Sequence, residues 1–350
     1  MTEILQLSVI AVMIYSYLYW GIRTLTGERW QMLAAVPFRK QEGGEWSGVN
    51  LTWYGLLTAN AYAFAVVVLF ILMGAVRVPL AGTAALAAAM LSLCVPASRL
   101  VARLVEKKAH TFTVGGAVFV GILMAPWIVL LVNHTMGAAW GFNVSPAAAL
   151  AAFAIAYAFG EGLGRLACVS FGCCYGRPLN EAPPWLARVF ASRSFSFYGK
   201  TRKIAYAGGL EGVRVLPVQA LTAIIHVCCG LGAILLFLHS RFVEAFAVTM
   251  AVTQGWRVLS ELLRADYRGN GKVSAYQIMG IVGIIYGSAA IILAPAASLA
   301  RPDLGAGIAT LWHPGLLIFF QALWLAIFIY TGRSTVTGAT LSFHVHRERI

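Results

Sequence analysis

The chain has 350 residues, of which 60% are hydrophobic and only 11% are charged. Because soluble domains carry about 25% charged residues, this composition excludes a soluble globular protein and predicts an all-α polytopic membrane protein. The formal net charge of +13 is large for so few charged residues. It indicates contact with anionic lipid headgroups or with an anionic substrate.

Nine apolar segments are each long enough to cross a bilayer as a helix. They cover residues 4–22, 52–76, 80–104, 114–132, 146–169, 218–238, 242–263, 276–293 and 311–330. The pattern predicts a bundle of about seven to nine transmembrane helices with a basic extramembrane loop region. The two long polar loops, 23–51 and 177–217, are expected to carry short amphipathic elements.

The entrances of two segments combine aromatic and small residues. Trp53 and Tyr54 open one segment, where an interfacial aromatic belt is the simplest interpretation, more so for Trp53 than for Tyr54. Gly115 and Gly116 open another, and they permit either close helix packing or close approach of the backbone to a ligand. His110 precedes them at the predicted interface, where a histidine is more often solvated than catalytic.

The most informative stretch is 160–178, which follows directly on an apolar segment. Glu161 and Arg165 lie four residues apart and therefore on one face of the predicted helix. A charge near the hydrocarbon region usually pairs or lines a polar cavity. The stretch then becomes rich in Gly and Cys and ends at Arg177. Two arginines, Arg165 and Arg177, near a lipid interface predict a phosphate-binding site.

A second charged stripe lies at the end of segment 242–263. Arg257, Glu261 and Arg264 fall at positions i, i+4 and i+7 of one helical face, and Arg257 can pair with Glu261 within the helix. Exposure to lipid would be costly, so the stripe is expected to face the bundle interior. Two interpretations stay open: a structural ion pair between helices, or a functional site with one arginine left after Glu261 is paired.

The six cysteines lie mostly in apolar surroundings and include two adjacent pairs. Adjacent cysteines are poorly placed to bridge each other, and no His or Cys spacing matches a zinc pattern. We therefore expect no structural disulfide, no metal and no other cofactor.

Loop 177–217 mixes basic and aromatic residues, which in a membrane protein favours a surface facing lipid headgroups over one that binds nucleic acid. Lys and Arg are concentrated in the loops after the first, third, fifth, seventh and ninth segments. The positive-inside rule would place these loops in the cytoplasm. Charges that serve an anionic substrate would weaken that inference.

In combination, these segments resemble the prolipoprotein diacylglyceryl transferase family over roughly 51–293. The resemblance rests on five ordered motifs, none diagnostic alone: Trp53-Tyr54-Gly55-Leu56, Val114-Gly115-Gly116, Gly164-Arg165 through Gly172-Cys173-Cys174-Tyr175-Gly176-Arg177-Pro178, Leu216-Pro217-Val218-Gln219, and Arg257 through Glu261 and Arg264 to Asp266-Tyr267-Arg268-Gly269. It implies a transferase-like membrane domain at 51–293. An extra N-terminal helix and loop at 1–50 would precede it, and an extra C-terminal helix and tail at 294–350 would follow.

The resemblance implies transfer of a diacylglyceryl group from phosphatidylglycerol to the lipobox cysteine thiol of a prolipoprotein, with a thioether and glycerol phosphate as products. The implied partners are phosphatidylglycerol, the prolipoprotein signal peptide and membrane lipids. The implied location is the bacterial cytoplasmic (inner) membrane, with the site on the periplasmic side. That orientation conflicts with the count of basic loops, and we prefer it because several counted arginines match family substrate ligands.

The resemblance also implies roles for individual residues, with Arg165, Arg257, Tyr54 and Glu261 as the catalytic set. Arg165 and Arg257 would clamp the phosphate, and Glu261 would orient an arginine. Tyr54 would line the pocket or assist proton transfer. The implied substrate-binding residues are Arg165, Arg257, Arg264, Gly115, Gly116, Cys168, Gly176 and Arg177.

Several proton-handling residues of the family are absent from this chain. Val114 replaces the usual histidine, Cys168 an asparagine and Thr253 a tyrosine, while Leu221 and Thr222 replace a tyrosine and a glutamate. These losses favour, as an alternative, a catalytically silent relative that binds lipid or lipoprotein. A lipid or anion transporter is a weaker alternative, because no inverted repeat is visible. The base is left open among Tyr54, His110 and the phosphate itself.

Overall fold

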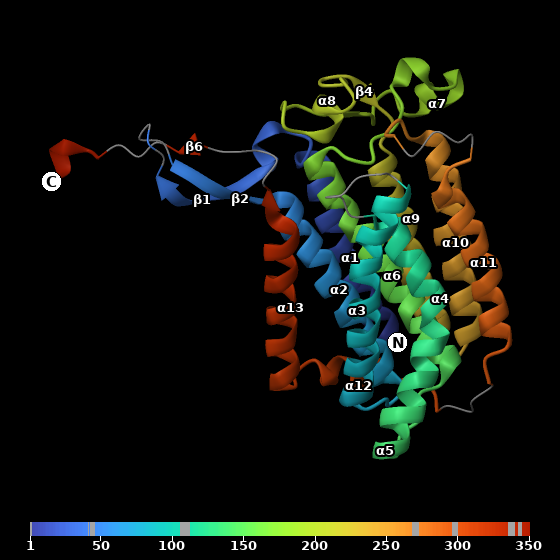
Figure 1. Cartoon of the computed structure of the whole chain (residues 1–350). Coiled ribbons are helices and arrows are strands. Elements are labelled where there is room, and N and C mark those ends of the chain that lie inside the picture. Colours follow the sequence, from blue (N-terminus) through green and yellow to red (C-terminus); the bar gives the residue numbers. More distant parts are fainter. Residues whose placement is uncertain are drawn as a thin grey trace.

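The computed structural model describes residues 2–40, 42, 46–105, 113–267, 273–295, 300–334, 340–341 and 345–350. Its long helices form one bundle (Figure 1): α1 (Thr2–Thr24), α2 (Trp53–Ala75), α3 (Leu80–Val105), α4 (Val114–Val132), α6 (Pro146–Phe171), α9 (Val218–Leu238), α10 (Phe242–Leu263), α11 (Ala275–Ile292) and α13 (Pro314–Gly332). Each predicted apolar segment corresponds to one of these helices. All except α10 are long and apolar enough to span a membrane, and α10 is more polar because it contains Glu244, Arg257 and Glu261. The predicted all-α polytopic membrane class is confirmed.

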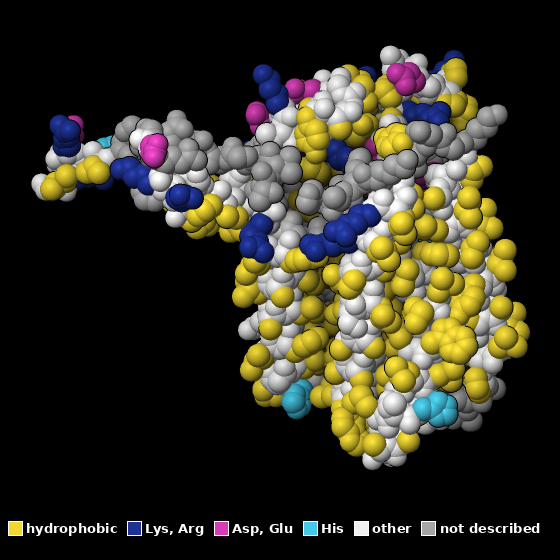
Figure 2. Space-filling model, in the orientation of Figure 1, with side chains coloured by type: hydrophobic (Ala, Val, Ile, Leu, Met, Phe, Trp, Pro, Cys, Tyr) yellow, Lys and Arg dark blue, Asp and Glu magenta, His cyan; other side chains and the backbone are white. Residues whose placement is uncertain are grey.

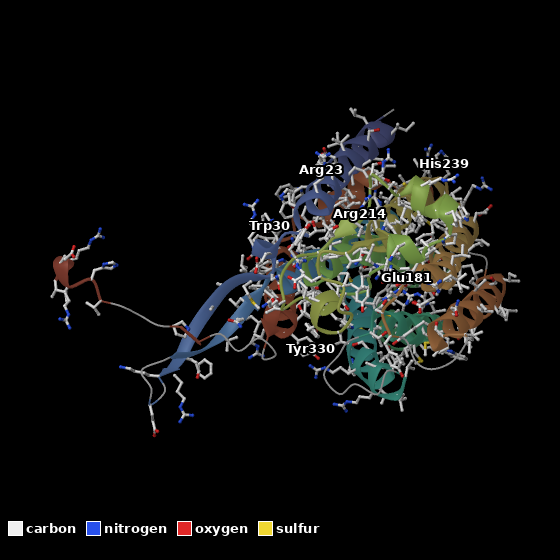
Figure 3. All side chains as sticks on the ribbon, turned by 90° about the horizontal axis from the view of Figure 1, so that it is seen from above. Arg23, Trp30, Glu181, Arg214, His239 and Tyr330 are labelled. Atoms are coloured by element: carbon white, nitrogen blue, oxygen red, sulfur yellow. The ribbon has the colours of Figure 1, made fainter. Side chains whose placement is uncertain are left out.

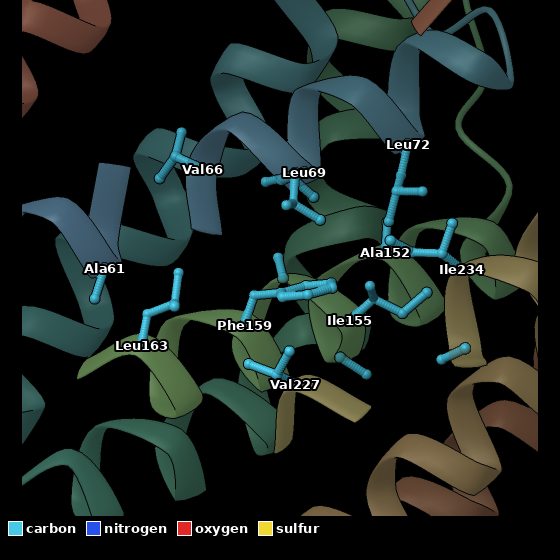
Figure 4. Close-up of a cluster of buried hydrophobic side chains, with 14 of the residues drawn as sticks. Ala61, Val66, Leu69, Leu72, Ala152, Ile155, Phe159, Leu163, Val227 and Ile234 are labelled. Atoms are coloured by element: carbon cyan, nitrogen blue, oxygen red, sulfur yellow. The ribbon is translucent and has the colours of Figure 1, made fainter. Parts of the chain in front are cut away.

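Helix α6 lies at the centre of the bundle. In its candidate membrane span 72% of the residues are buried, against 11% in α13. It packs against α2, α4, α9 and α10, and its alanine-rich first half lets these neighbours approach closely. Figure 4 shows Ile155 and Phe159 of α6 between Leu69 of α2 and Val227 of α9. The helix that carries Glu161 and Arg165 is therefore fixed on several sides.

The chain between α6 and α9 folds over one end of the bundle, and we call 177–217 the head region (Figure 1). It contains η3 (Leu179–Glu181), α7 (Pro184–Val189), β3 (Phe195–Ser196), α8 (Lys203–Tyr206) and β4 (Arg214–Val215), with β3 and β4 antiparallel. Viewed from above, Glu181 and Arg214 lie over the bundle (Figure 3). In the space-filling view, Lys and Arg gather at this end, while hydrophobic side chains cover the helices below (Figure 2).

The second long loop forms a β-sheet, although the sequence had predicted only short amphipathic elements there. After η1 (Glu28–Trp30), β1 (Met32–Lys40) pairs antiparallel with β2 (Trp46–Thr52), and β5 (Arg333–Ser334) and β6 (Thr340–Leu341) pair with β2. The strands extend to one side of the bundle (Figures 1 and 3). The remaining elements are η2 (Asn133–Gly137), α5 (Ala138–Trp140), α12 (Leu304–Thr310) and η4 (Arg347–Arg349).

A buried arginine joins the head region to the bundle. Arg202 is fully buried, and burial lowers the pKa of its guanidinium to about 10, which leaves it charged at neutral pH. Its N–H groups donate to the carbonyls of Tyr198, Val169, Ser170, Leu25 and Gly27. Four of these carbonyls lie at or just beyond the C-terminal ends of α6 and α1, where helix carbonyls lack intrahelical partners. One side chain therefore fixes the end of α6, the end of α1 and the head region together.

We predict that Arg202→Met lowers the free energy of unfolding by about 3 kcal/mol, because several buried carbonyls lose their only charged donor. Thermal unfolding of the full chain in detergent measures this. Arg214→Met, which removes an exposed arginine of the same region, is the control and should leave the melting temperature nearly unchanged. Equal effects of the two substitutions would contradict the role given to Arg202.

Candidate functional site

A cavity of about 750 Å³ opens between the helices and the head region. Leu150 and Arg165 both line it from α6, and 15 residues of helix span about 22 Å. Toward Leu150 the lining is apolar and includes Leu69 and Phe153, whereas toward Arg165 it includes charged residues and Lys203 of the head region. The cavity is therefore elongated, with a charged end and an apolar end. This shape suits an amphipathic molecule with an anionic headgroup.

The charged end is centred on one carboxylate that two arginines share. The Glu161 side chain is 1% exposed, Arg165 forms an ion pair with it, and Arg257 Nη2 lies 3.6 Å from its Oε1. Arg257 Nη2 also donates to the Tyr157 hydroxyl at 2.9 Å. The three charged groups leave a net charge of +1 in a largely buried site, where an uncompensated charge is costly. The arrangement favours an anion as the missing partner.

Two hydrogen-bond donors without a partner among the described residues also favour a bound anion. The Nε atoms of Arg165 and Arg257 are buried and have no hydrogen-bond partner among the described residues. Buried donors are normally satisfied, and a guanidinium matches the geometry of phosphate oxygens. The structure thus brings together the two arginines that the sequence predicted as a phosphate clamp. Their binding of substrate stays a prediction.

The charged stripe of α10 pairs differently from the sequence-based expectation. Arg257 pairs with Glu161 of α6 rather than with Glu261, because α6 packs directly against α10. Glu261 instead lies 3.3 Å from Arg264 Nη1. Arg264 also donates to both carboxylate oxygens of Asp266, at 2.7 and 2.9 Å. Two carboxylates offset this one guanidinium, and the predicted role of Arg264 as a substrate ligand stays untested.

The loop after α6 is joined to the end of α10 by backbone hydrogen bonds. Arg177 N donates to Leu263 O at 2.9 Å, and Ala265 N donates to Tyr175 O at 3.1 Å. Gly176 is buried between these bonds, where a β-carbon would collide with the carbonyl of Leu216. The Arg177 side chain is exposed and does not line the cavity. The structure therefore places Gly176 and Arg177 in the loop that shapes the site, and their predicted substrate contacts stay untested.

The two glycines of α4 have different surroundings. A β-carbon at Gly115 would lie 2.6 Å from Arg257 Nη1 and 2.6 Å from Tyr276 Cδ1, so glycine is what lets the guanidinium lie against α4. Gly116 faces Val101 of α3 and serves close helix packing. Of the predicted site residues around them, Tyr54 lines the cavity, with its ring 5.6 Å from that of Phe171. His110 lies outside the described residues.

Three cysteines meet at the charged end of the cavity. The Sγ atoms of Cys168, Cys173 and Cys174 lie within 4.8 Å of one another, and all three residues line the cavity. They come together because α6 ends at Gly172, whose φ of +68° reverses the chain. Hydrogen bonds with Cys168 and Cys173, together with the guanidinium groups of Arg264 and Arg165, hold the pKa of the Cys174 thiol well below its usual value. The spacing of these residues had not suggested such a cluster.

A buried histidine is a site residue that the sequence analysis missed, as is Tyr157. His226 of α9 is 2% exposed and lines the cavity. Its Nδ1 lies 3.0 Å from Thr222 O, so Nδ1 donates and Nε2 is left as an acceptor in the neutral ring. Gln219, Thr222 and His226 form a polar stripe at i, i+3 and i+7 on an otherwise apolar helix. This polar stripe could have identified His226 as a site residue from the sequence alone.

We predict that Gly115→Ala lowers the affinity for an anionic phospholipid about tenfold, because the added methyl group would displace the Arg257 guanidinium. Binding to vesicles with and without anionic lipid measures this. Gly255→Ala on α10 is the matched control, since a β-carbon there meets nothing within 4 Å. Unchanged binding by Gly115→Ala would show that the position of Arg257 does not matter for anion binding.

Comparison with known proteins agrees with this geometry. No curated protein matches the chain significantly. The family model described as prolipoprotein diacylglyceryl transferase matches residues 45–293, which is more than half of the chain and includes every charged residue of the cavity discussed above. The chain therefore belongs to the prolipoprotein diacylglyceryl transferase family.

Proposed function

We propose that this protein transfers a diacylglyceryl group from phosphatidylglycerol to the cysteine thiol of a prolipoprotein lipobox. Family membership supports diacylglyceryl transfer in general. The choice of phosphatidylglycerol as the lipid donor rests on the two arginines that share Glu161 at the charged end of an otherwise apolar cavity. A phosphodiester headgroup brings one negative charge, which balances the net charge of the three side chains.

The same cluster suits the leaving group of the reaction. The acceptor sulfur forms a bond to the diacylglycerol carbon that carries the phosphate ester oxygen, and the carbon–oxygen bond breaks. The electron pair stays on the phosphate, which leaves as glycerol phosphate with a second negative charge. Arg165 and Arg257 are placed to stabilise that added charge, with donors already desolvated and oriented. Glu161 would then keep both guanidinium groups aligned before the substrate arrives.

The acceptor thiol must lose its proton, and we assign this proton to His226. The thiolate is the reactive form of cysteine, and Val114 stands where the family histidine is expected. His226 Nε2 is the acceptor atom of a buried ring that lines the same cavity. The hydrogen bond from Nδ1 to Thr222 would fix the ring and its tautomer. Tyr54 would line the donor site rather than take the proton.

We place the protein in the bacterial cytoplasmic membrane with the charged end of the cavity on the periplasmic side. The apolar helices and the family support an integral membrane protein. The basic head region would then face the headgroups of the outer leaflet, where a signal peptide and its lipobox reach the cavity. This orientation runs against the count of basic loops, which includes arginines that line the site.

A catalytically silent relative is the second candidate function, and Val114 is the observation that favours it. Such a protein would bind anionic lipid or lipoprotein through Arg165 and Arg257 without forming a product. Thr222 and Thr253 stand at two further positions where the resemblance leads us to expect proton-handling groups. Product formation separates the two candidates, because both predict binding.

We predict that Arg165→Ala reduces transfer by more than about 100-fold, since the leaving phosphate loses a desolvated donor. Vesicles of phosphatidylglycerol, a lipobox peptide and mass spectrometry of the peptide measure this. Arg188→Ala, at an exposed arginine of α7, should retain full activity. Full activity of Arg165→Ala would refute the clamp.

We predict that His226→Gln lowers kcat by about 100-fold while leaving the affinity for phosphatidylglycerol within twofold, because glutamine keeps polarity but cannot take a proton. Turnover and vesicle binding are measured on the same preparation. A parallel loss of binding and turnover would indicate a structural role, and unchanged turnover would exclude His226 as the proton acceptor.

A further inference from the structure

The three-cysteine cluster has no role in the reaction as described so far. Cys168 lies in the last turn of α6, while Cys173 and Cys174 follow the turn at Gly172. Gln219 Nε2 donates to Cys173 O at 2.9 Å and fixes this turn against α9. Cys174 itself has a φ of +56°, a left-handed conformation that is uncommon outside glycine. The local backbone thus holds two neighbouring thiols and a third from the helix at one point of the cavity wall.

The distances fit a metal ion bound by thiolates. Zinc–sulfur bonds of about 2.3 Å in a tetrahedron separate the sulfur atoms by about 3.8 Å. The three Sγ atoms already lie within 4.8 Å of one another, so small side-chain rotations would close the site. All three residues line the cavity, and the fourth corner of the tetrahedron would therefore face the cavity. Three protein ligands with one open position is the arrangement of catalytic zinc sites.

The charges around the three cysteines also suit a metal ion bound by thiolates. A divalent ion with three thiolates has a net charge of −1, and a fourth thiolate would make it −2. Arg165 Nη1 lies 4.0 Å from Cys168 Sγ, and Arg264 lines the same end of the cavity. Arg165 would offset part of this charge, whereas Arg264 is already paired with Glu261 and Asp266. Arg165 also belongs to the phosphate clamp, so a ligand in the open position would lie next to the bound phosphate.

We propose that Cys168, Cys173 and Cys174 bind one thiophilic divalent metal ion of the Zn²⁺ class, and that its open position takes the thiol of the acceptor peptide. The second part rests on the proposed function. The metal ion would assist the loss of the thiol proton that we assign to His226, because a thiol that coordinates zinc is deprotonated.

The step balances without any further reactant. The acceptor thiol binds the metal ion and releases one proton, which passes to His226 and then to water. The metal-bound sulfur forms a bond to the diacylglycerol carbon as the carbon–oxygen bond to phosphate breaks. The products are a thioether, glycerol phosphate and the released proton, and the metal ion keeps its charge. Because a thioether is a weaker ligand than a thiolate, the product would leave the metal ion readily.

The test begins with metal binding and does not depend on turnover. The full chain, purified without an affinity tag, is loaded with Zn²⁺ or Co²⁺, and metal per chain is measured by elemental analysis. We expect one ion per chain, with sulfur-to-cobalt charge-transfer absorption for Co²⁺. Cys168→Ser, Cys173→Ser and Cys174→Ser should each lose the ion. Cys94→Ser, at another cysteine that lines the cavity, should retain it.

Addition of a lipobox peptide then tests the open position. The spectrum of the Co²⁺ protein should change with the cysteine peptide and not with a serine analogue. A stoichiometry well below one, equal binding by the triple Cys→Ser variant, or a disulfide among the three cysteines in the purified protein would overturn the metal site. A Co²⁺ spectrum that does not change when the cysteine peptide is added would overturn the role of the metal ion in thiol binding.

Transfer activity separates this inference from the proposed function. If both are correct, a chelator should lower transfer at least tenfold and Zn²⁺ should restore it. Undiminished transfer by metal-free protein would overturn the role of the metal ion in thiol binding and leave the transferase intact. A thiol-dependent Co²⁺ spectrum without any transfer would instead support the metal site and contradict the transferase. The chelator experiment uses wild-type protein, so its result does not depend on substitutions that disturb folding.

Discussion

The structure depends on one carboxylate held between two arginines inside a membrane bundle. Glu161 offsets only one of the two positive charges of Arg165 and Arg257, and its side chain is almost fully buried. A net positive charge in such surroundings is costly unless an anion arrives. The bundle therefore contains a buried cluster whose net positive charge favours the binding of an anion. The apolar remainder of the cavity provides room for acyl chains beside it.

Close packing positions this charged cluster. Gly115 lets the Arg257 guanidinium lie against α4, and Gly176 lets the loop after α6 pass the backbone at Leu216. Arg202 fixes the end of α6 to the end of α1 and to the head region through five backbone carbonyls. The positions of Arg165 and the three cysteines therefore depend on a buried arginine that does not touch the cavity. This is how a site inside a lipid-embedded bundle acquires rigid donors.

The length and apolar composition of the segments were enough to predict each long helix, because lipid imposes both on a membrane span. The i, i+4 pair of Glu161 and Arg165 also followed from helix geometry. The contact of Glu161 with Arg257 did not, because it depends on how α6 and α10 pack. The cysteine cluster depends on the turn at Gly172, and the β-sheet beside the bundle on pairing between distant strands. His226 was missed because a single histidine in an apolar helix is usually structural.

The decisive experiment measures the transfer reaction. The purified chain in phosphatidylglycerol vesicles is given a lipobox peptide, and the peptide is weighed by mass spectrometry. We expect a diacylglyceryl mass gain on the cysteine peptide, none on its serine analogue, and none when phosphatidylglycerol is replaced by a zwitterionic phospholipid. An unchanged peptide mass, with phosphatidylglycerol bound and an active family member working in parallel, would exclude transferase activity and identify the protein as a lipid-binding relative.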